Sequence, residues 1–307
     1  MASPESEILA DLYRDWGRRM AADPEMPIDE FRDMFEEWAT VTAEPADVAY
    51  EDTAIGGIPA LWARPASHRQ DVLLICFHGG GYVTGSRASH RKLFGHIAVA
   101  AKAPALIVEY RRAPESPYPA AVEDALIAYR WALGSRLKAK NIAFVGDSAG
   151  GGLAVALALA ARRDGLPLPG AIFVMSPWLD LEAKGQSYDA NAGVDLIVSR
   201  PVIQSLVPAL LGATGSVEDP IANPIRADPA GLPPVLIQVG AHESFLDDSR
   251  NFTALATQAG VEVELDVVPE MQHVFHFLGG MAPEANAAIA RAGAWLEAKL
   301  TARRAPA

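Results

Sequence analysis

A serine is framed by small residues in the string Gly146-Asp147-Ser148-Ala149-Gly150. An apolar run at residues 142–145 leads into this string, and an apolar helical pattern at residues 151–163 follows it. The small flanking residues permit a sharp strand-to-helix turn, which would expose the Ser148 hydroxyl at its apex. A serine in that position can attack a carbonyl, so we predict that Ser148 is a nucleophile. The alternative is a glycine-rich turn in which Ser148 only caps a helix.

Three consecutive glycines, Gly79, Gly80 and Gly81, follow His78 and the apolar run at residues 72–77. Glycines let the backbone approach a bound group closely and point its N–H groups at one spot. Together with the N–H of Ala149, these donors can hold the oxyanion of a tetrahedral intermediate. A phosphate-binding loop is the alternative interpretation. It is weaker because no Lys-Ser/Thr pair follows and no acidic ribose partner stands at the expected offset.

A serine nucleophile needs a general base to take its proton at neutral pH. Around this kind of turn the chain order is serine, then acid, then histidine. Of the seven histidines, His273 follows a late apolar run at residues 261–268 and precedes the last helical pattern. We therefore predict that His273 is the base, with His276 as its competitor three residues later.

The acid that orients this histidine is expected just after the apolar run at residues 235–239. Glu243, Asp247 and Asp248 are the candidates. Asp247 and Asp248 stand where a helix begins, so helix capping is the simpler role for both. Glu243 lies in the loop directly after the run, and we predict that it is the acid.

From about residue 47 onward, short apolar runs alternate with helical patterns, which indicates a mostly parallel sheet covered by helices on both faces. Two further runs, at residues 48–53 and 59–64, flank Gly56-Gly57 and predict a hairpin. Other strands are predicted at residues 72–77, 105–110, 142–145, 171–175, 235–239 and 261–268. Helices are predicted at residues 88–102, 120–133, 151–163, 249–259 and 284–300.

Two segments stand outside this alternation. The first forty residues predict two amphipathic helices, whose apolar stripes we expect to pack mainly on the body of the protein. Residues 178–225 contain no clean strand and one apolar helical pattern near residues 202–211. We interpret this interval as an insertion that caps the sheet.

Composition excludes several classes of protein. With 26 Lys+Arg against 38 Asp+Glu, the net charge is −12, which argues against nucleic acid or an anionic membrane as a partner. The single cysteine, Cys76, excludes a disulfide framework and a multi-cysteine metal site. The first residues lack a basic and apolar leader, so we expect a soluble, cytoplasmic protein.

Longer stretches of the chain resemble the hormone-sensitive-lipase-like group of α/β-hydrolases, which includes bacterial carboxylesterases. The resemblance covers about residues 70–280 and lies in the strings HGGGYVTGS, YRRAPESPYPAAVEDALIAYRW, GDSAGGGLA, SPWLDL, NPIRAD and GLPPVLIQVG. It places the nucleophile on Ser148, the base on His273, and the oxyanion donors in the Gly79–Gly81 run, above all Gly80 and Gly81, together with Ala149. The group usually has Asp-Pro-Leu-x-Asp at its acid, whereas this chain has Glu243 and Ser244 at the first two positions.

The resemblance also implies an α/β-hydrolase fold with a two-part cap. The expected parts are cap helices at residues 1–45, core at 46–177, a cap insertion at 178–225 and core at 226–307. Trp178 is similar to a position beside the acyl pocket, where an indole should shorten that pocket. By analogy with relatives that are often dimers, we expect a homodimer.

The expected function is hydrolysis of short- to medium-chain carboxylic esters through a Ser-His-acid triad and an acyl-enzyme. This chemistry needs no metal and no organic cofactor. The nearest alternative is an N-acyl amide or formamide hydrolase that uses the same triad. A remote alternative is a non-catalytic small-molecule receptor, because this fold also serves as a hormone receptor in plants, where the base is typically missing.

Overall fold

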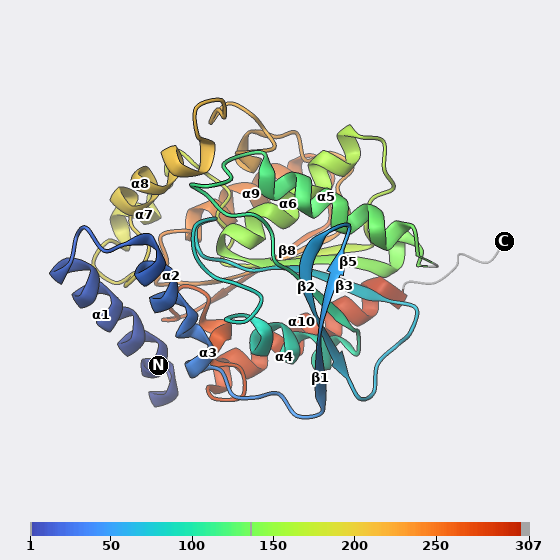
Figure 1. Cartoon of the computed structure of the whole chain (residues 1–307), viewed down its shortest axis with the longest axis horizontal. Helices are drawn as coiled ribbons and strands as arrows, with labels where there is room; N and C mark the ends of the chain where they lie inside the picture. The colour runs from blue at the N-terminus through green and yellow to red at the C-terminus, as the bar shows by residue number, and fades with distance from the viewer. Residues whose placement is uncertain (1, 136, 302–307) are drawn as a thin grey trace.

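The protein, described by a computed structural model for residues 2–135 and 137–301, is built on one eight-stranded sheet (Figure 1). The strand order is β1-β2-β4-β3-β5-β6-β7-β8. Strand β2 is antiparallel to both of its neighbours, and all pairings from β4 to β8 are parallel. The strands are β1 (Val48–Ile55), β2 (Ile58–Pro65), β3 (Leu73–Phe77), β4 (Ala105–Val108), β5 (Ile142–Asp147), β6 (Ala171–Met175), β7 (Val235–Gly240) and β8 (Val263–Val268).

The predicted hairpin is confirmed as β1 and β2, which pair along their whole length. Ile55 and Ile58 close the ladder on either side of Gly56 and Gly57. These two glycines have φ values of 58° and 88°, the left-handed backbone that a tight two-residue hairpin requires. The turn residues therefore set the register that the alternating strand residues follow.

Helices cover both faces of the sheet, as the run of apolar strands predicted. One face carries α5 (Ala120–Leu133), α6 (Ser148–Arg163) and α9 (Leu246–Gln258). The opposite face carries α4 (Arg91–Ala101) and α10 (Pro283–Thr301), which pack against each other (Figure 1). Every residue of β3, β4, β5, β6 and β7 is buried, because these strands contribute side chains to both layers.

Two groups of helices lie at the end of the molecule where the parallel strands finish (Figure 1). The first is the N-terminal segment with η1 (Pro4–Ser6), α1 (Glu7–Ala22), α2 (Ile28–Glu36) and α3 (Trp38–Val41). The second lies between β6 and β7 and contains α7 (Ser187–Ala190), α8 (Arg200–Leu211) and η3 (Pro224–Arg226). Residues 178–225 contain no strand, as predicted. The first forty residues were predicted to form two helices, but the second helix ends at Glu36 and Trp38 begins a separate short helix, α3.

Loops at the carboxyl ends of the strands carry the residues that the sequence singled out. Ser148 follows β5, Glu243 follows β7, and His273 lies between β8 and η4 (Phe275–Leu278). One more short turn, η2 (Ala139–Asn141), precedes β5. Among the described residues, no helix combines the length and the apolar character needed to cross a lipid bilayer.

Candidate active site

Ser148 stands at the sharp turn between β5 and α6. Asp147 is still extended, whereas Ser148 has φ +51°, a left-handed conformation that is uncommon outside glycine. A Cβ added at Gly150 would lie 2.0 Å from the carbonyl oxygen of Phe77, so only glycine lets α6 approach β3 this closely. The predicted strand, turn and helix are present, and the helix begins at Ser148 itself rather than three residues later.

His273 and Glu243 form a buried pair. The Nδ1 atom of His273 lies 2.8 Å from Oε2 of Glu243, and the two residues are 3% and 0% exposed. The other carboxylate oxygen, Oε1, accepts hydrogen bonds from the Ser176 hydroxyl at 2.7 Å and from the Gly240 N–H at 2.5 Å. With Nδ1 facing the carboxylate, Nε2 is the imidazole nitrogen left for a second partner.

The pKa shifts of His273 and Glu243 suit this pair to proton transfer. Burial lowers the pKa of His273, but the hydrogen bond and the charge of Glu243, together with the charges of Asp195 and Asp147, raise the pKa above its ordinary value. Burial raises the pKa of Glu243, and the hydrogen bonds from His273, Ser176 and Gly240 act in the opposite direction. The carboxylate therefore favours a protonated imidazole, the form that a general base takes up during reaction.

The competing residues have other partners. His276 is fully buried, its Nε2 lies 3.0 Å from the side-chain oxygen of Gln238, and burial lowers its pKa to about 3. Asp247 accepts a hydrogen bond from the N–H of Ser187 at 2.9 Å. Asp248 accepts from the N–H groups of Leu179 and Asp180 at 3.0 and 2.9 Å. Both aspartates thus hold the 178–187 segment instead of capping their own helix.

The glycine loop divides into one internal residue and two that face a cavity. The N–H of Gly79 donates to Oδ1 of Asp147 at 3.1 Å and to Nε2 of His90 at 3.2 Å. Gly79 is therefore corrected from an oxyanion donor to an anchor of the loop, because its only N–H is already engaged. Gly80 and Gly81 have φ values of 108° and 62° and line the same cavity as Ser148.

Ala149 remains available as a donor by its position in α6. It is the second residue of that helix, and the first N–H groups of a helix have no acceptor inside it. The positive end of the helix dipole lies at the same place, which favours developing negative charge. Gly80, Gly81 and Ala149 thus form the candidate oxyanion hole.

Sequence reasoning missed the residues that support the glycine loop. Nε2 of His90 lies 3.3 Å from Oδ2 of Asp147, and both side chains are buried. The Tyr110 hydroxyl donates to the backbone oxygen of His78 at 2.7 Å, and the Tyr110 ring stacks on the His78 ring at 4.2 Å. Asp147 stands inside the serine string, but no spacing rule links it to His90, 57 residues earlier.

A cavity of about 290 Å³ brings Ser148 and His273 together. The N-terminal segment, the 178–225 interval and the core loops all contribute to its wall. Trp178 lines it and stacks against Phe245 with the ring centroids 6.2 Å apart. The residues that line it are Met20, Asp23, Pro24, Met26, Phe31, Phe35, Trp38, Gly80, Gly81, Thr84, Ser148, Trp178, Ile197, Val198, Val202, Ile203, Ser205, Leu206, Phe245 and His273.

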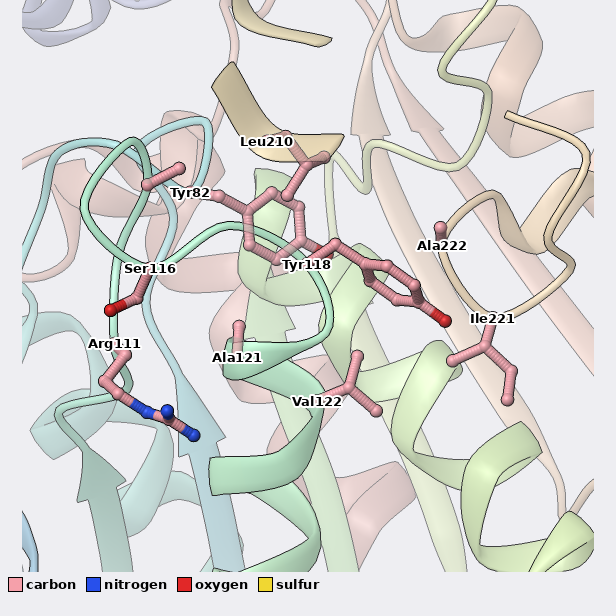
Figure 2. A pocket seen from close by; sticks show the side chains of 10 residues that line it. Tyr82, Arg111, Ser116, Tyr118, Ala121, Val122, Leu210, Ile221 and Ala222 are labelled. Carbon is pink, nitrogen blue, oxygen red and sulfur yellow. The ribbon is translucent and has the colours of Figure 1, made fainter. Parts of the chain in front are cut away.

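A smaller hollow lies beside Tyr82. Tyr82, Tyr118 and Leu210 line it together with residues at the start of α5 and at Ile221 and Ala222 (Figure 2). Its volume is about 10 Å³, which is room for about one water molecule. Ser148 does not line it, so the larger cavity is the candidate substrate site.

Comparison with known proteins agrees with this architecture. Residues 74–277 match a family described by the alpha/beta hydrolase fold. The chain is 40% identical over 300 residues to an acetyl-hydrolase of Streptomyces hygroscopicus, covering 96% of this chain and 97% of that protein.

Solved structures extend the likeness to the whole chain. One is an esterase from the bacterial hormone-sensitive lipase family, with a TM-score of 0.92, 40% identity, and coverage of 98% and 99% of the two chains. Another is a protein named EstE5, soaked with p-nitrophenyl butyrate, with a TM-score of 0.89, 37% identity, and coverage of 97% and 99%. On these findings, the chain belongs to the α/β-hydrolase family, within its hormone-sensitive-lipase-like group.

Proposed function

We propose that the protein hydrolyses short- to medium-chain carboxylic esters through an acyl-enzyme on Ser148. The observation that carries the proposal is that His273, joined to the buried Glu243 at 2.8 Å, lines the same cavity as Ser148, which stands at a strained strand-to-helix turn. These are the parts that serine acyl transfer needs: a nucleophile, a base and a group that orients the base.

In the proposed reaction, His273 takes the proton of Ser148 while the serine oxygen attacks the ester carbonyl. Glu243 holds the imidazole in the required tautomer and stabilises its charged form. The carbonyl oxygen becomes an oxyanion, which the N–H groups of Gly80, Gly81 and Ala149 stabilise. His273 then gives its proton to the leaving alcohol, and a water molecule repeats the sequence on the acyl-enzyme to release the acid.

The lining of the cavity favours an uncharged substrate of limited length. Most of its lining side chains are apolar, and Asp23 is the only carboxylate among the described residues that line it. Trp178 is only 2% exposed and occupies part of the wall near Ser148. We propose that residues 1–45 and 178–225 are the two parts of the cap, since both contribute side chains to this wall. A cytoplasmic location and a homodimer stay predictions.

The direct test is turnover of p-nitrophenyl esters by Ser148→Ala. We expect activity to fall by about 10⁶-fold, because removal of a serine nucleophile disables the whole triad. A serine-reactive phosphonate should label the wild-type protein at Ser148 and leave the variant unlabelled. Circular dichroism checks that the variant is folded.

Retained turnover or labelling elsewhere in the folded variant would remove Ser148 as the nucleophile. The same assays with N-acyl amides and lactones separate ester hydrolysis from the alternatives. Higher kcat/KM on amides than on the matched esters would replace esterase by amide hydrolase as the proposed function.

A further inference from the structure

Ser176 is a buried residue at the end of β6 for which the sequence indicated no role. Strand β6 lies between β5, which leads to Ser148, and β7, which leads to Glu243. Ser176 is 0% exposed and has φ +46°. Its N–H donates to the backbone oxygen of Gln238 in β7 at 2.7 Å. The residue therefore adopts an uncommon backbone conformation within the sheet edge that carries the active site.

The Ser176 hydroxyl joins two loops of that site. It donates to Oε1 of Glu243 at 2.7 Å, and it accepts the N–H of Val274 at 3.1 Å. Val274 follows His273 directly and itself has φ +50°. A hydroxyl has one proton, so donation to the carboxylate leaves its lone pairs for Val274. One oxygen atom thus contacts both the acid and the backbone beside the base.

The hydrogen bonds to Oε1 orient the Glu243 carboxylate toward His273. Oε1 receives Ser176 and Gly240, and Oε2 remains for the imidazole at 2.8 Å. Without the Ser176 donor, the carboxylate would keep one partner on Oε1 and could rotate away from Nδ1. The Ser176 hydrogen bond also lowers the pKa of Glu243 against the effect of burial, and so favours the ionised form that attracts the proton on His273.

We propose that Ser176 is a positioning residue, whose hydroxyl sets the rotation of the Glu243 carboxylate and anchors the loop that carries His273. The proposal rests on the proposed function, because it assigns Ser176 to the same triad. A purely architectural role is the competing explanation, in which Ser176 serves only to turn the chain out of β6.

Two substitutions separate the hydroxyl from the backbone. Ser176→Ala removes the hydroxyl and keeps the Cβ at a positive φ. Ser176→Gly also removes the hydroxyl, but glycine adopts a positive φ without strain. Ser249→Ala is the matched control, because Ser249 is 0% exposed and its Oγ has no hydrogen-bond partner among the described residues.

We expect both Ser176 variants to lower kcat by about 10- to 100-fold, the range for losing a hydrogen bond to a charged group, with KM changed less than about twofold. The acid limb of kcat/KM against pH should move to lower pH. Glu243 raises the pKa of His273 more than Asp195 and Asp147 do, and a less firmly held Glu243 carboxylate raises it less, while the two aspartates are unchanged. Ser249→Ala should keep the wild-type kcat and pH profile.

The proposal is overturned if Ser176→Gly retains the wild-type kcat and pH profile, because the backbone turn alone would then account for Ser176. It is equally overturned if both variants lose only thermal stability. Titration of His273 by NMR in the Ser148→Ala background gives a readout that needs no turnover. A lower His273 pKa on adding Ser176→Ala supports the linkage even if ester hydrolysis fails, and an unchanged pKa refutes it.

Discussion

Glu243 stands where the hormone-sensitive-lipase-like group usually has aspartate. Its additional methylene is accommodated because the carboxylate is held at three points, by His273, Ser176 and Gly240. Ser244, which stands at the usual proline position, donates its hydroxyl to the backbone oxygen of Val198 at 2.9 Å. The substituted pair thus has its own hydrogen-bond network and ties the acid loop to the 178–225 interval.

At the scale of single residues, Glu243→Gln and Asp247→Asn should differ sharply in their effect on kcat. An amide at position 243 removes the charge that stabilises the imidazolium, so we expect kcat to fall by about 10³- to 10⁴-fold. Asp247 accepts from Ser187 and does not contact His273, so Asp247→Asn should lower kcat by less than about tenfold. Steady-state kinetics on one p-nitrophenyl ester measures both. The opposite ranking would assign the orienting role to Asp247.

A substitution at Trp178 gives a second prediction at the level of a single residue. Its indole lines the cavity, and its Nε1 donates to the backbone oxygen of Asp180 at 3.2 Å. Trp178→Ala should shift the optimum of kcat/KM toward longer acyl chains, because truncation opens the wall beside Ser148. A series of p-nitrophenyl esters from about two to twelve carbons measures the shift, for which one added buried methylene contributes about 1 kcal/mol. An unchanged profile would show that Trp178 does not limit chain length.

Among the elements, the passage from β5 into α6 depends on close backbone contact with β3. Gly150→Ala would put a Cβ 2.0 Å from the Phe77 carbonyl, and we expect a loss of about 3 kcal/mol or more in the free energy of unfolding. Gly17→Ala is the matched control in α1, where an added Cβ meets nothing within 4 Å.

The control should raise the free energy of unfolding by about 0.5–1 kcal/mol, because alanine restricts the unfolded chain. Urea denaturation measures both variants. If Gly150→Ala unfolds at the wild-type midpoint, α6 can shift away from β3 and the close approach is not a requirement of the fold.

Across the whole molecule, the N-terminal helices are bonded to the active-site loop. The hydroxyl of Tyr13 in α1 donates to the backbone oxygen of His273 at 2.9 Å and accepts from Nε1 of Trp38 at 3.1 Å. Trp38 in turn stacks on Phe277 with the centroids 5.0 Å apart. This segment is therefore part of the core on that face, although Phe31, Phe35 and Trp38 also reach the cavity.

Tyr13→Phe should consequently change both stability and catalysis. We expect a loss of about 1–3 kcal/mol in the free energy of unfolding, since two buried polar groups lose their partner, together with a lower kcat. Tyr129→Phe is the control, because among the described residues its hydroxyl bonds only the backbone oxygen of Pro167, and Tyr129 does not line the cavity. It should lose stability without a change in kcat. If Tyr13→Phe and Tyr129→Phe have the same kcat, the contact from α1 does not contribute to the function of the His273 loop.

The sequence by itself predicted the elements and the groups that we propose to react. Periodicity predicted the hairpin and the parallel strands, because burial on one or two faces leaves a direct pattern in neighbouring residues. The strings around Ser148 and Gly79–Gly81 predicted the turn and the glycine loop, since backbone conformation there depends on local residue size. Chain order and position after the two late strands, together with the family resemblance, selected His273 and Glu243 for the proposed pair.

Only the tertiary structure decided how those groups are held. The engagement of Gly79 by Asp147 and His90, the Ser176 bridge and the Tyr13 contact join residues 11 to 260 positions apart. Such pairs have no fixed spacing, because they form where separate loops meet at the carboxyl edge of the sheet. Local pattern therefore identifies which residues can react, and long-range packing determines which hydrogen bonds orient them.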